Sequence, residues 1–292
     1  MSLQTISSLG GGPLTNLLAS GAGPRGILGL VTVAAVVLVP ATQIKTTYGI
    51  SVGYGAAMAA MGVALGLAYP APQSWLAPAV TAATVVYGVR LSVFLWLRQV
   101  LEWRPPTPSH ALNETPRFKR IPFALSLALF YACLATPLLF VVANEESSLP
   151  AMRPLQILGL ALAWGGVWME GIADAHKSWV KLTARKTTKD SSVFVGPTGG
   201  LYALVRHPNY LGEVTFYTGL TVAAIPALGK SLPGWICSLL GLAGITSLMS
   251  GSTRRLVEKQ EKTYGGQAKF EAWKKKVPYP WIPLVKDVNK TK

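Results

Sequence analysis

Acidic side chains are scarce in this chain, and none occurs before Glu102. The 292 residues contain 12 acidic against 27 basic side chains, and only 13% are charged, against about 25% in an average soluble domain. Cysteine is scarcer still. Cys133 and Cys237 lie within apolar runs, so we interpret them as small core residues rather than a disulfide or a metal pair.

Familiar soluble motifs are also missing. The three histidines lack metal-ligand spacing, so the sequence predicts no metal site. The chain has no P-loop, no GxSxG elbow and no soluble dinucleotide fingerprint. Whatever chemistry it performs must come from side chains that the fold brings together.

Long apolar runs dominate the chain instead. Half of the residues are hydrophobic, and the mean hydropathy is +0.38. Seven segments approach the roughly 20 apolar residues that span a bilayer. They cover residues 26–42, 49–69, 76–100, 121–142, 155–181, 209–228 and 232–250, the last continuing as a charged helix towards Tyr264. The predicted fold class is therefore all-α, a polytopic integral membrane protein with about seven transmembrane helices in the lipid bilayer.

The predicted domain organisation is simple. Residues 1–25 are rich in Ser, Gly and Leu, with one Arg and no acid, and we expect a disordered tail. A transit peptide has a similar composition but carries more Arg. Residues 26–292 form a single membrane domain, and its motif core covers residues 170–264.

The basic residues are concentrated in three segments, 102–120, 177–206 and 251–292, which seven spans place on the same side. By the positive-inside rule this side is cytoplasmic, and it includes the C-terminus. Anionic cytoplasmic lipids therefore explain the net charge of +15 better than nucleic acid does. We expect a multi-pass protein of the endoplasmic reticulum, or of another endomembrane or organelle membrane.

The densest group of polar side chains precedes the sixth apolar run. It consists of Arg206, His207, Asn209, Tyr210 and Glu213. Pro208 suits the first turn of a helix because it has no backbone N–H, and a helix from there places Asn209 and Glu213 on one face. A carboxylate at the head of a membrane helix is costly unless it has a function. We therefore place the chemistry here, although a helix start with interfacial tyrosine anchors gives a similar pattern.

The fifth apolar run carries charged residues at helical spacing. Glu170, Asp174, Lys177 and Lys181 recur on one predicted helix face. Carboxylates suit ribose or amide donors and lysines suit phosphates, so this face is a candidate ligand site. An internal salt-bridge ladder is the alternative. Arg185, Lys186 and Lys189 follow, and they form either a patch for a polyanionic ligand or one for lipid headgroups.

Two further pairs of residues are candidates for the site. Arg90 lies within the third apolar run and needs a partner or a polar cavity, and Tyr87 precedes it by nearly one turn. A nearby cation makes a phenol a better proton donor, whereas a salt bridge from Arg90 to Glu170 or Glu213 would be purely structural. Arg254 and Tyr264, after the seventh run, are candidates to reach back into the site.

These residues together resemble the steroid 5-alpha-reductase superfamily. The similarity rests on Gly200-Leu201-Tyr202, on Arg206-His207-Pro208-Asn209-Tyr210-Leu211-Gly212-Glu213 and on Ala173-Asp174-x-x-Lys177. It is closest to the branch known mainly as a domain of unknown function. The resemblance implies a seven-helix bundle with a cytoplasm-facing NADPH site, in which Asn209, Glu213, Asp174, Lys181 and Arg185 contact the cofactor. It also implies that Tyr87, with Arg90, polarises the carbonyl of a hydrophobic substrate.

The chain departs from this family at one position. Steroid reductases pair the tyrosine with a glutamate from an amino-terminal helix, but this chain has no acid there, and Gln43 is a poor proton donor. The expected function is an NADPH-dependent reductase of a conjugated double bond in a lipid or steroid-like enone. Two alternatives stay open. One is an S-adenosylmethionine-dependent methyltransferase of the isoprenylcysteine carboxyl type, and the other is a non-catalytic protein that keeps the cofactor pocket.

Overall fold

The computed structural model describes residues 26–69, 74–100, 114–143, 150–187, 190, 192–283 and 285, and these residues form helices and no strand. The tail expected over residues 1–25 lies outside this part of the chain. The helices are α2 (Ile27–Ile44), α3 (Val52–Ala68), α4 (Leu76–Val100), α6 (Arg117–Ala143), α7 (Arg153–Thr187), α8 (Pro208–Leu228), α9 (Leu232–Tyr264) and α10 (Ala268–Lys276), with short 3-10 turns η2 (Thr46–Ile50), η4 (Pro150–Met152) and η5 (Gly200–Ala203).

Six of these helices are long and apolar enough to cross a membrane, which confirms the all-α, multi-pass fold class. The seventh expected span, over 49–69, is the shorter helix α3. It has 17 residues, or about 25 Å at 1.5 Å per residue. The preceding residues 46–50 form the 3-10 turn η2 instead of extending it.

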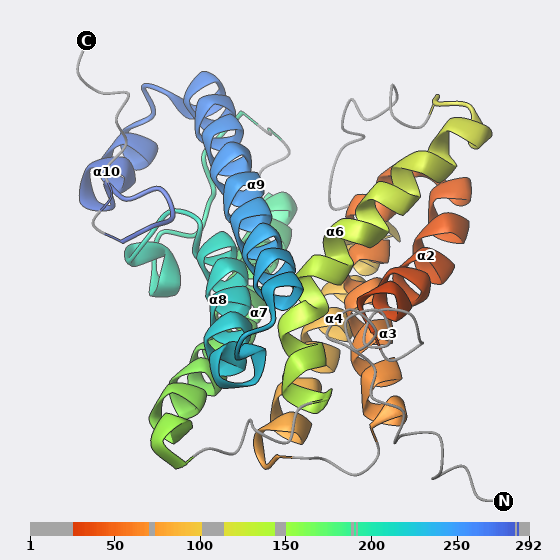
Figure 1. Ribbon diagram of the computed structural model, residues 1–292. Coiled ribbons are helices and arrows are strands. Elements are labelled where there is room, and N and C mark those ends of the chain that lie inside the picture. The colour runs from red at the N-terminus through yellow and green to blue at the C-terminus, as the bar shows by residue number, and fades with distance from the viewer. Residues whose placement is uncertain are drawn as a thin grey trace, which may run out of the picture.

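The helices form two groups joined by α6 (Figure 1). In one group α3 packs against α4 and α2 against α6, and in the other α7 packs along α8. Helix α6 also contacts α8 and α9, and α4 contacts α7, so both groups share one apolar core. Residues of the site therefore come from segments far apart in the chain.

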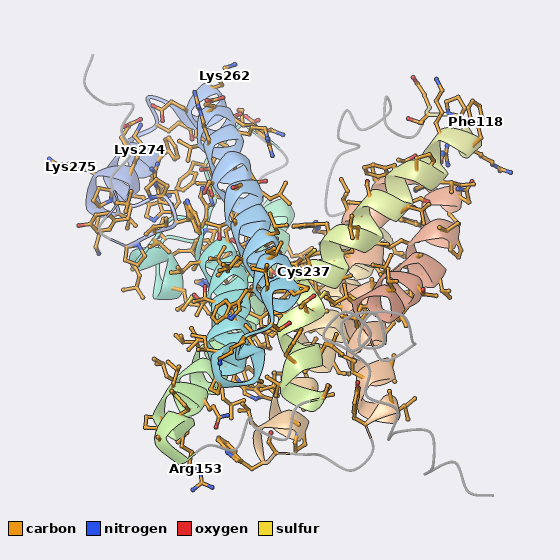
Figure 2. All side chains as sticks on the ribbon, viewed as in Figure 1. Phe118, Arg153, Cys237, Lys262, Lys274 and Lys275 are labelled. Carbon is orange, nitrogen blue, oxygen red and sulfur yellow. The ribbon has the colours of Figure 1, made fainter. Side chains whose placement is uncertain are left out.

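The two ends of the bundle match the expected charge distribution. Figure 2 shows Lys262, at the end of α9, and Phe118, at the start of α6, at one end of the molecule, with Arg153, at the start of α7, at the other. The start of α6 and the end of α9, which both carry basic residues, therefore lie on the same side. Which side faces the cytoplasm stays a prediction.

Helices α7 and α8 approach each other closely through glycines. A Cβ on Gly166 would lie 2.4 Å from the backbone nitrogen of Phe216, and one on Gly212 would lie 2.6 Å from that of Glu170. Real side chains do not occupy such positions. This contact places the backbones of Glu170 and Gly212 together, and so brings two of the predicted site segments side by side.

Alanine substitutions at two neighbouring glycines of α7 test this packing. Gly166→Ala is expected to lower the free energy of unfolding by about 1–3 kcal/mol, because the methyl group overpacks the contact with α8. Gly165→Ala is the matched control, since nothing lies within 4 Å of its Cβ position. At Gly165, the better helix propensity of alanine is expected to raise the free energy of unfolding by no more than about 1 kcal/mol. Thermal unfolding of both purified variants measures the difference, and equal midpoints would contradict the close packing.

A smaller apolar cluster fixes the C-terminal helix α10. Phe270 and Trp273 of this helix, and Val277 directly after it, pack against Phe194 and Tyr202. Both cysteines are free, as expected, although Cys133 and Cys237 share a side-chain hydrogen bond between α6 and α9. The apolar contacts hold α10 over the loop that carries the predicted motif.

Candidate functional site

A cluster of buried phenols surrounds the carboxylate of Glu213. The hydroxyl of Tyr54 donates to Glu213 Oε1 at 2.9 Å, and it lies 3.0 Å from the hydroxyl of Tyr87 and 2.6 Å from that of Tyr217. All four side chains are at least 93% buried. These residues come from α3, α4 and α8, and we call them the tyrosine cluster.

The donor and the acceptor of each hydrogen bond to Tyr54 follow from the number of protons and lone pairs on a phenol. A phenol has one proton and two acceptor lone pairs. Because Tyr54 gives its proton to Glu213, both of its lone pairs remain to accept from Tyr87 and Tyr217. Tyr54 is therefore fully satisfied and is the centre of the cluster.

Arg90 forms a second charged group beside this cluster. Its Nη2 forms an ion pair with Glu170 Oε1 at 2.7 Å, and its Nη1 donates to Asp174 Oδ2 at 3.2 Å. The guanidinium also lies 5.8 Å from the ring centroid of Tyr87. The predicted pair of Tyr87 and Arg90 therefore meets the carboxylates of α7, so the salt bridge that we considered as an alternative is present.

Aromatic packing fixes the position of Tyr87. Its ring stacks on Phe216 with centroids 4.2 Å apart and an interplanar angle of 11°, and its edge meets Tyr217. The side chain is fully buried. Such packing allows little rotation, so the hydroxyl has a defined direction.

The loop before α8 is held by hydrogen bonds to distant segments. Gly200 takes the left-handed φ of +59° that glycine tolerates, which turns the chain beside His176. The hydroxyl of Tyr202 donates to the carbonyl of Ala173, and Trp273 Nε1 donates to the carbonyl of Tyr202. Arg206 and His207 then enter the protein directly before Pro208, the first residue of α8, as predicted.

His207 is a buried polar group with unused hydrogen-bonding capacity. It is 1% exposed, and among the described residues neither ring nitrogen has a hydrogen-bond partner. Burial, followed by the positive charges of Lys177 and Arg206, lowers the pKa of His207 well below its usual range. The imidazole is therefore neutral at pH 7. Asn209 Oδ1 and Glu170 Oε2 are likewise buried without a hydrogen-bond partner in this part of the chain.

Some of the predicted cofactor residues lie further from these groups. Lys177 is half-buried near His207, whereas Lys181 is exposed on the next turn of α7. Tyr210 is half-buried beside the ring of His207. Arg185 lies in the last turn of α7, but its side chain is outside the described part.

The two residues expected to reach back from the C-terminal part do not contact the cluster. Arg254 pairs with Glu258 on an exposed face of α9, and 76% of its side chain is accessible. Tyr264 packs against Phe194 and Phe270 in the apolar cluster below α10. Their predicted role in cofactor binding has no contact that supports it among the described residues.

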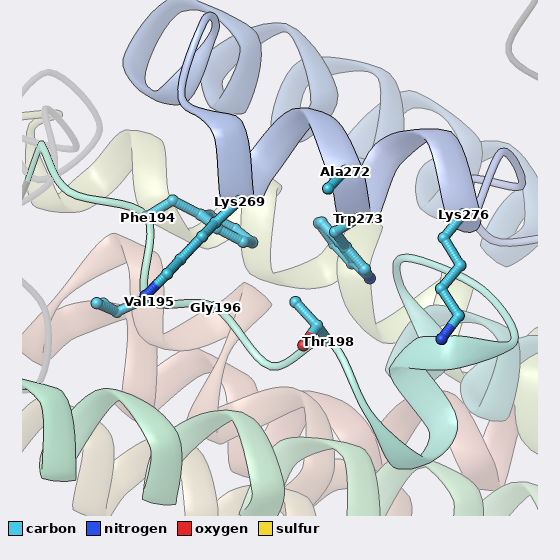
Figure 3. A pocket seen from close by; sticks show the side chains of 8 residues that line it. All are labelled: Phe194, Val195, Gly196, Thr198, Lys269, Ala272, Trp273 and Lys276. Atoms are coloured by element: carbon cyan, nitrogen blue, oxygen red, sulfur yellow. The ribbon is translucent and has the colours of Figure 1, made fainter.

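Two hollows lie outside the tyrosine cluster. A groove of about 580 Å³ separates α10 from the extended segment 194–198 (Figure 3). A smaller, almost wholly apolar one of about 290 Å³ lies between α7, α8, α9 and Trp281. Neither is lined by the predicted catalytic or cofactor residues.

Sequence reasoning missed the centre of the cluster. Tyr54 lies in a run of Gly, Ala and Met, where a tyrosine has no polar neighbour that would draw attention to it. Tyr131, whose ring lies 4.7 Å from that of Tyr54, was missed for the same reason. Tyr217 lies on the same face of α8 as Glu213, and this helical spacing was the one feature of the sequence that pointed to the cluster.

The fold and the site define a multi-pass helical membrane protein with a buried tyrosine–carboxylate cluster beside an arginine ion pair. The chain belongs to the family described as "Protein of unknown function (DUF1295)", whose model matches residues 39–277. No curated protein and no solved structure matches it. This membership is consistent with the resemblance to the steroid 5-alpha-reductase superfamily and assigns no activity.

Proposed function

We propose that this protein is a membrane-embedded, NADPH-dependent reductase of a conjugated double bond in a lipid or steroid-like enone. The observation that carries the proposal is the Tyr87 hydroxyl, which is buried within the tyrosine cluster beside the Arg90 ion pairs. A rigid phenol in a water-poor site can stabilise the negative charge that develops on a carbonyl oxygen. The guanidinium of Arg90 supports this role.

The residues around α7 and the start of α8 fit a phosphorylated dinucleotide. Lys177 and Arg206 bring positive charge to the surroundings of His207, which suits phosphate. The partnerless polar atoms of His207, Asn209 and Glu170 suit the amide and hydroxyl groups of such a cofactor, because a buried polar atom without a partner costs about 1–3 kcal/mol. Bound NADPH would supply hydride to the β carbon of the enone. The cofactor would be held and oriented by Asp174, Lys177, Lys181, Asn209 and Glu213.

Tyr54 is proposed to direct the proton of Tyr87. With Glu213 ionised, Tyr54 donates to the carboxylate, and Tyr87 donates to Tyr54. Tyr87 can then serve a substrate oxygen only by giving up that bond. With a proton on Glu213, the chain can run from Glu213 to Tyr54 to Tyr87, and Tyr87 is free to donate outward. In this proposal Tyr54 takes the place beside Tyr87 that an amino-terminal glutamate takes in steroid reductases.

Tyr54→Phe is expected to lower kcat by about 10–100-fold, a part of the 10²–10⁴-fold that a positioned proton donor contributes. The ring and its packing remain, so KM for the enone is expected to change little. Steady-state NADPH oxidation, followed from about pH 5 to about pH 9, measures both constants and the pH profile. The pH dependence carried by Glu213 should also flatten, which a purely structural role of Tyr54 would not cause. An unchanged pH profile together with unchanged kcat would reject the role.

Ligand-dependent thermal stability tests the cofactor directly. NADPH at about 100 times its Kd is expected to add about 2.7 kcal/mol to the stability of the purified protein. S-adenosylmethionine is expected to leave the melting midpoint unchanged, because its sulfonium group has no use for a cationic patch. Asn209→Ala is expected to reduce the response to NADPH, since it removes a buried acceptor from the proposed site.

The outcomes separate the three candidate functions. Stabilisation by S-adenosylmethionine alone would overturn the reductase in favour of a methyltransferase. Stabilisation by NADPH without oxidation of any member of an enone panel would favour a non-catalytic protein with a cofactor pocket. Stabilisation by NADPH with enone-dependent oxidation is the expected result.

A further inference from the structure

The groove beside α10 has a charge pattern that the proposed reductase site does not use. Lys269 and Lys276 extend from this helix towards the segment 194–198, Lys269 at the Val195 end and Lys276 at the other, with Thr198 between them (Figure 3). The two lysines are seven residues apart, about 10 Å along a helix. None of the described residues that line the groove carries a carboxylate.

These two lysines differ from Lys274 of the same helix, which ion pairs hold in place. Lys274 is 6% exposed and is neutralised by Glu261 at 2.7 Å and Glu271 at 3.0 Å. Lys269 and Lys276 are exposed, and neither forms an ion pair or hydrogen bond with any residue that the structure describes. The groove therefore keeps two uncompensated positive charges.

The opposite wall adds neutral donors. The backbone N–H groups of Val195, Gly196 and Thr198 have no acceptor among the described residues, and the Thr198 hydroxyl faces the same groove. Backbone amide donors and ammonium groups together are common surroundings of a phosphate. The volume of about 580 Å³ exceeds one phosphate and suits a ligand with further polar parts.

Both walls are fixed before any ligand arrives. Phe194 stacks on Trp273 with centroids 5.5 Å apart, and its backbone nitrogen donates to Gln267 Oε1 at 2.7 Å. Lys274 ties α10 to the end of α9 through Glu261. A preformed site binds without a large cost of ordering its own side chains.

We propose that this groove is a phosphate-binding site, separate from the reductase site, for the phosphate groups of an anionic ligand. The ligand is either the headgroup of a phospholipid at the membrane surface or a free phosphorylated metabolite. Lys269 and Lys276 bind its charges, and the amides of Val195, Gly196 and Thr198 bind the remaining oxygens.

The test compares two double variants that remove the same charge. Lys269→Ala with Lys276→Ala removes the groove cations, whereas Lys262→Ala with Lys275→Ala removes two exposed lysines that do not line it. Inorganic pyrophosphate is titrated calorimetrically into the detergent-purified protein. In a second arm, native mass spectrometry follows retention of phosphatidic acid after reconstitution with phosphatidylcholine and phosphatidic acid.

The groove variant is expected to lose at least tenfold in affinity for pyrophosphate or in retention of phosphatidic acid, while the control variant stays within twofold of the wild type. Loss in the pyrophosphate arm identifies a free metabolite, and loss in the lipid arm alone identifies a headgroup. Stabilisation by NADPH is expected to persist in both variants. The proposal is overturned if the wild type binds neither probe, if both variants weaken equally, or if the groove variant loses its response to NADPH.

Discussion

Tyr87→Phe is expected to abolish most of the enone-dependent NADPH oxidation, with a loss in kcat of about 10³-fold, in the middle of the range for a general acid. The phenylalanine keeps the stacking on Phe216, so the fold and the cofactor site should survive. Only the hydroxyl that we propose to stabilise charge on the carbonyl oxygen is lost. Single-turnover and steady-state NADPH absorbance measure the loss, and NADPH-dependent thermal stability confirms that the cofactor still binds.

Tyr131→Phe is the matched control for this experiment. Tyr131 lies against Tyr54 in the same apolar surroundings, but its hydroxyl donates to the carbonyl of Gly49 and takes no part in the hydrogen bonds around Glu213. The control is expected to keep turnover within a fewfold of the wild type. If Tyr87→Phe were equally active, the proton donor would have to be sought elsewhere.

Arg90→Ala is expected to cause the largest loss of stability of any single substitution considered. Glu170 and Asp174 are 3% and 7% exposed, and removal of Arg90 leaves two buried carboxylates without their cation. Removing one partner of a buried pair costs about 3–5 kcal/mol. Thermal unfolding in lipid nanodiscs measures the loss.

Two further variants test whether buried charge causes the loss of stability in Arg90→Ala. Arg254→Ala breaks a pair with Glu258 on an exposed helix face and should cost only about 0.3–0.5 kcal/mol. The triple variant Arg90→Met, Glu170→Gln, Asp174→Asn removes all three charges, and we expect it to recover part of the stability lost by Arg90→Ala. If the triple variant were less stable than Arg90→Ala, packing rather than buried charge would be responsible.

The sequence predicted the spans better than it predicted the site. Apolar length and charge spacing place the helices, because the bilayer sets both, and Pro208 begins α8 as expected. The exception is the start of the second span, where Gly49 and Ile50 belong to the 3-10 turn η2 and the helix begins only at Val52. The face formed by Glu170 and Asp174 and its contact with Arg90 were also among the possibilities that the pattern offered.

The partners of Tyr87 could not be predicted in the same way. Tyr54 lies 33 residues from Tyr87 and 159 from Glu213 in the chain, and only the packing of α3 and α4 against α8 brings these hydroxyls together. No local sequence pattern indicates a contact between residues so far apart in the chain. Arg254, a candidate to reach back into the site from α9, instead pairs locally with Glu258, one helical turn away.

The length of α7 has a consequence for any molecule that binds along it. Its 35 residues extend about 52 Å, whereas the hydrocarbon core is about 30 Å thick, so the helix continues well into water on the side opposite Arg153. Counted from Arg153, about 20 residues cross the core, which leaves Glu170 near the boundary and Lys181 about 16 Å further out. A ligand that extended along α7 from Glu170 to Lys181 would need one hydrophobic end and one polar end. It could enter and leave from the aqueous side without crossing the membrane.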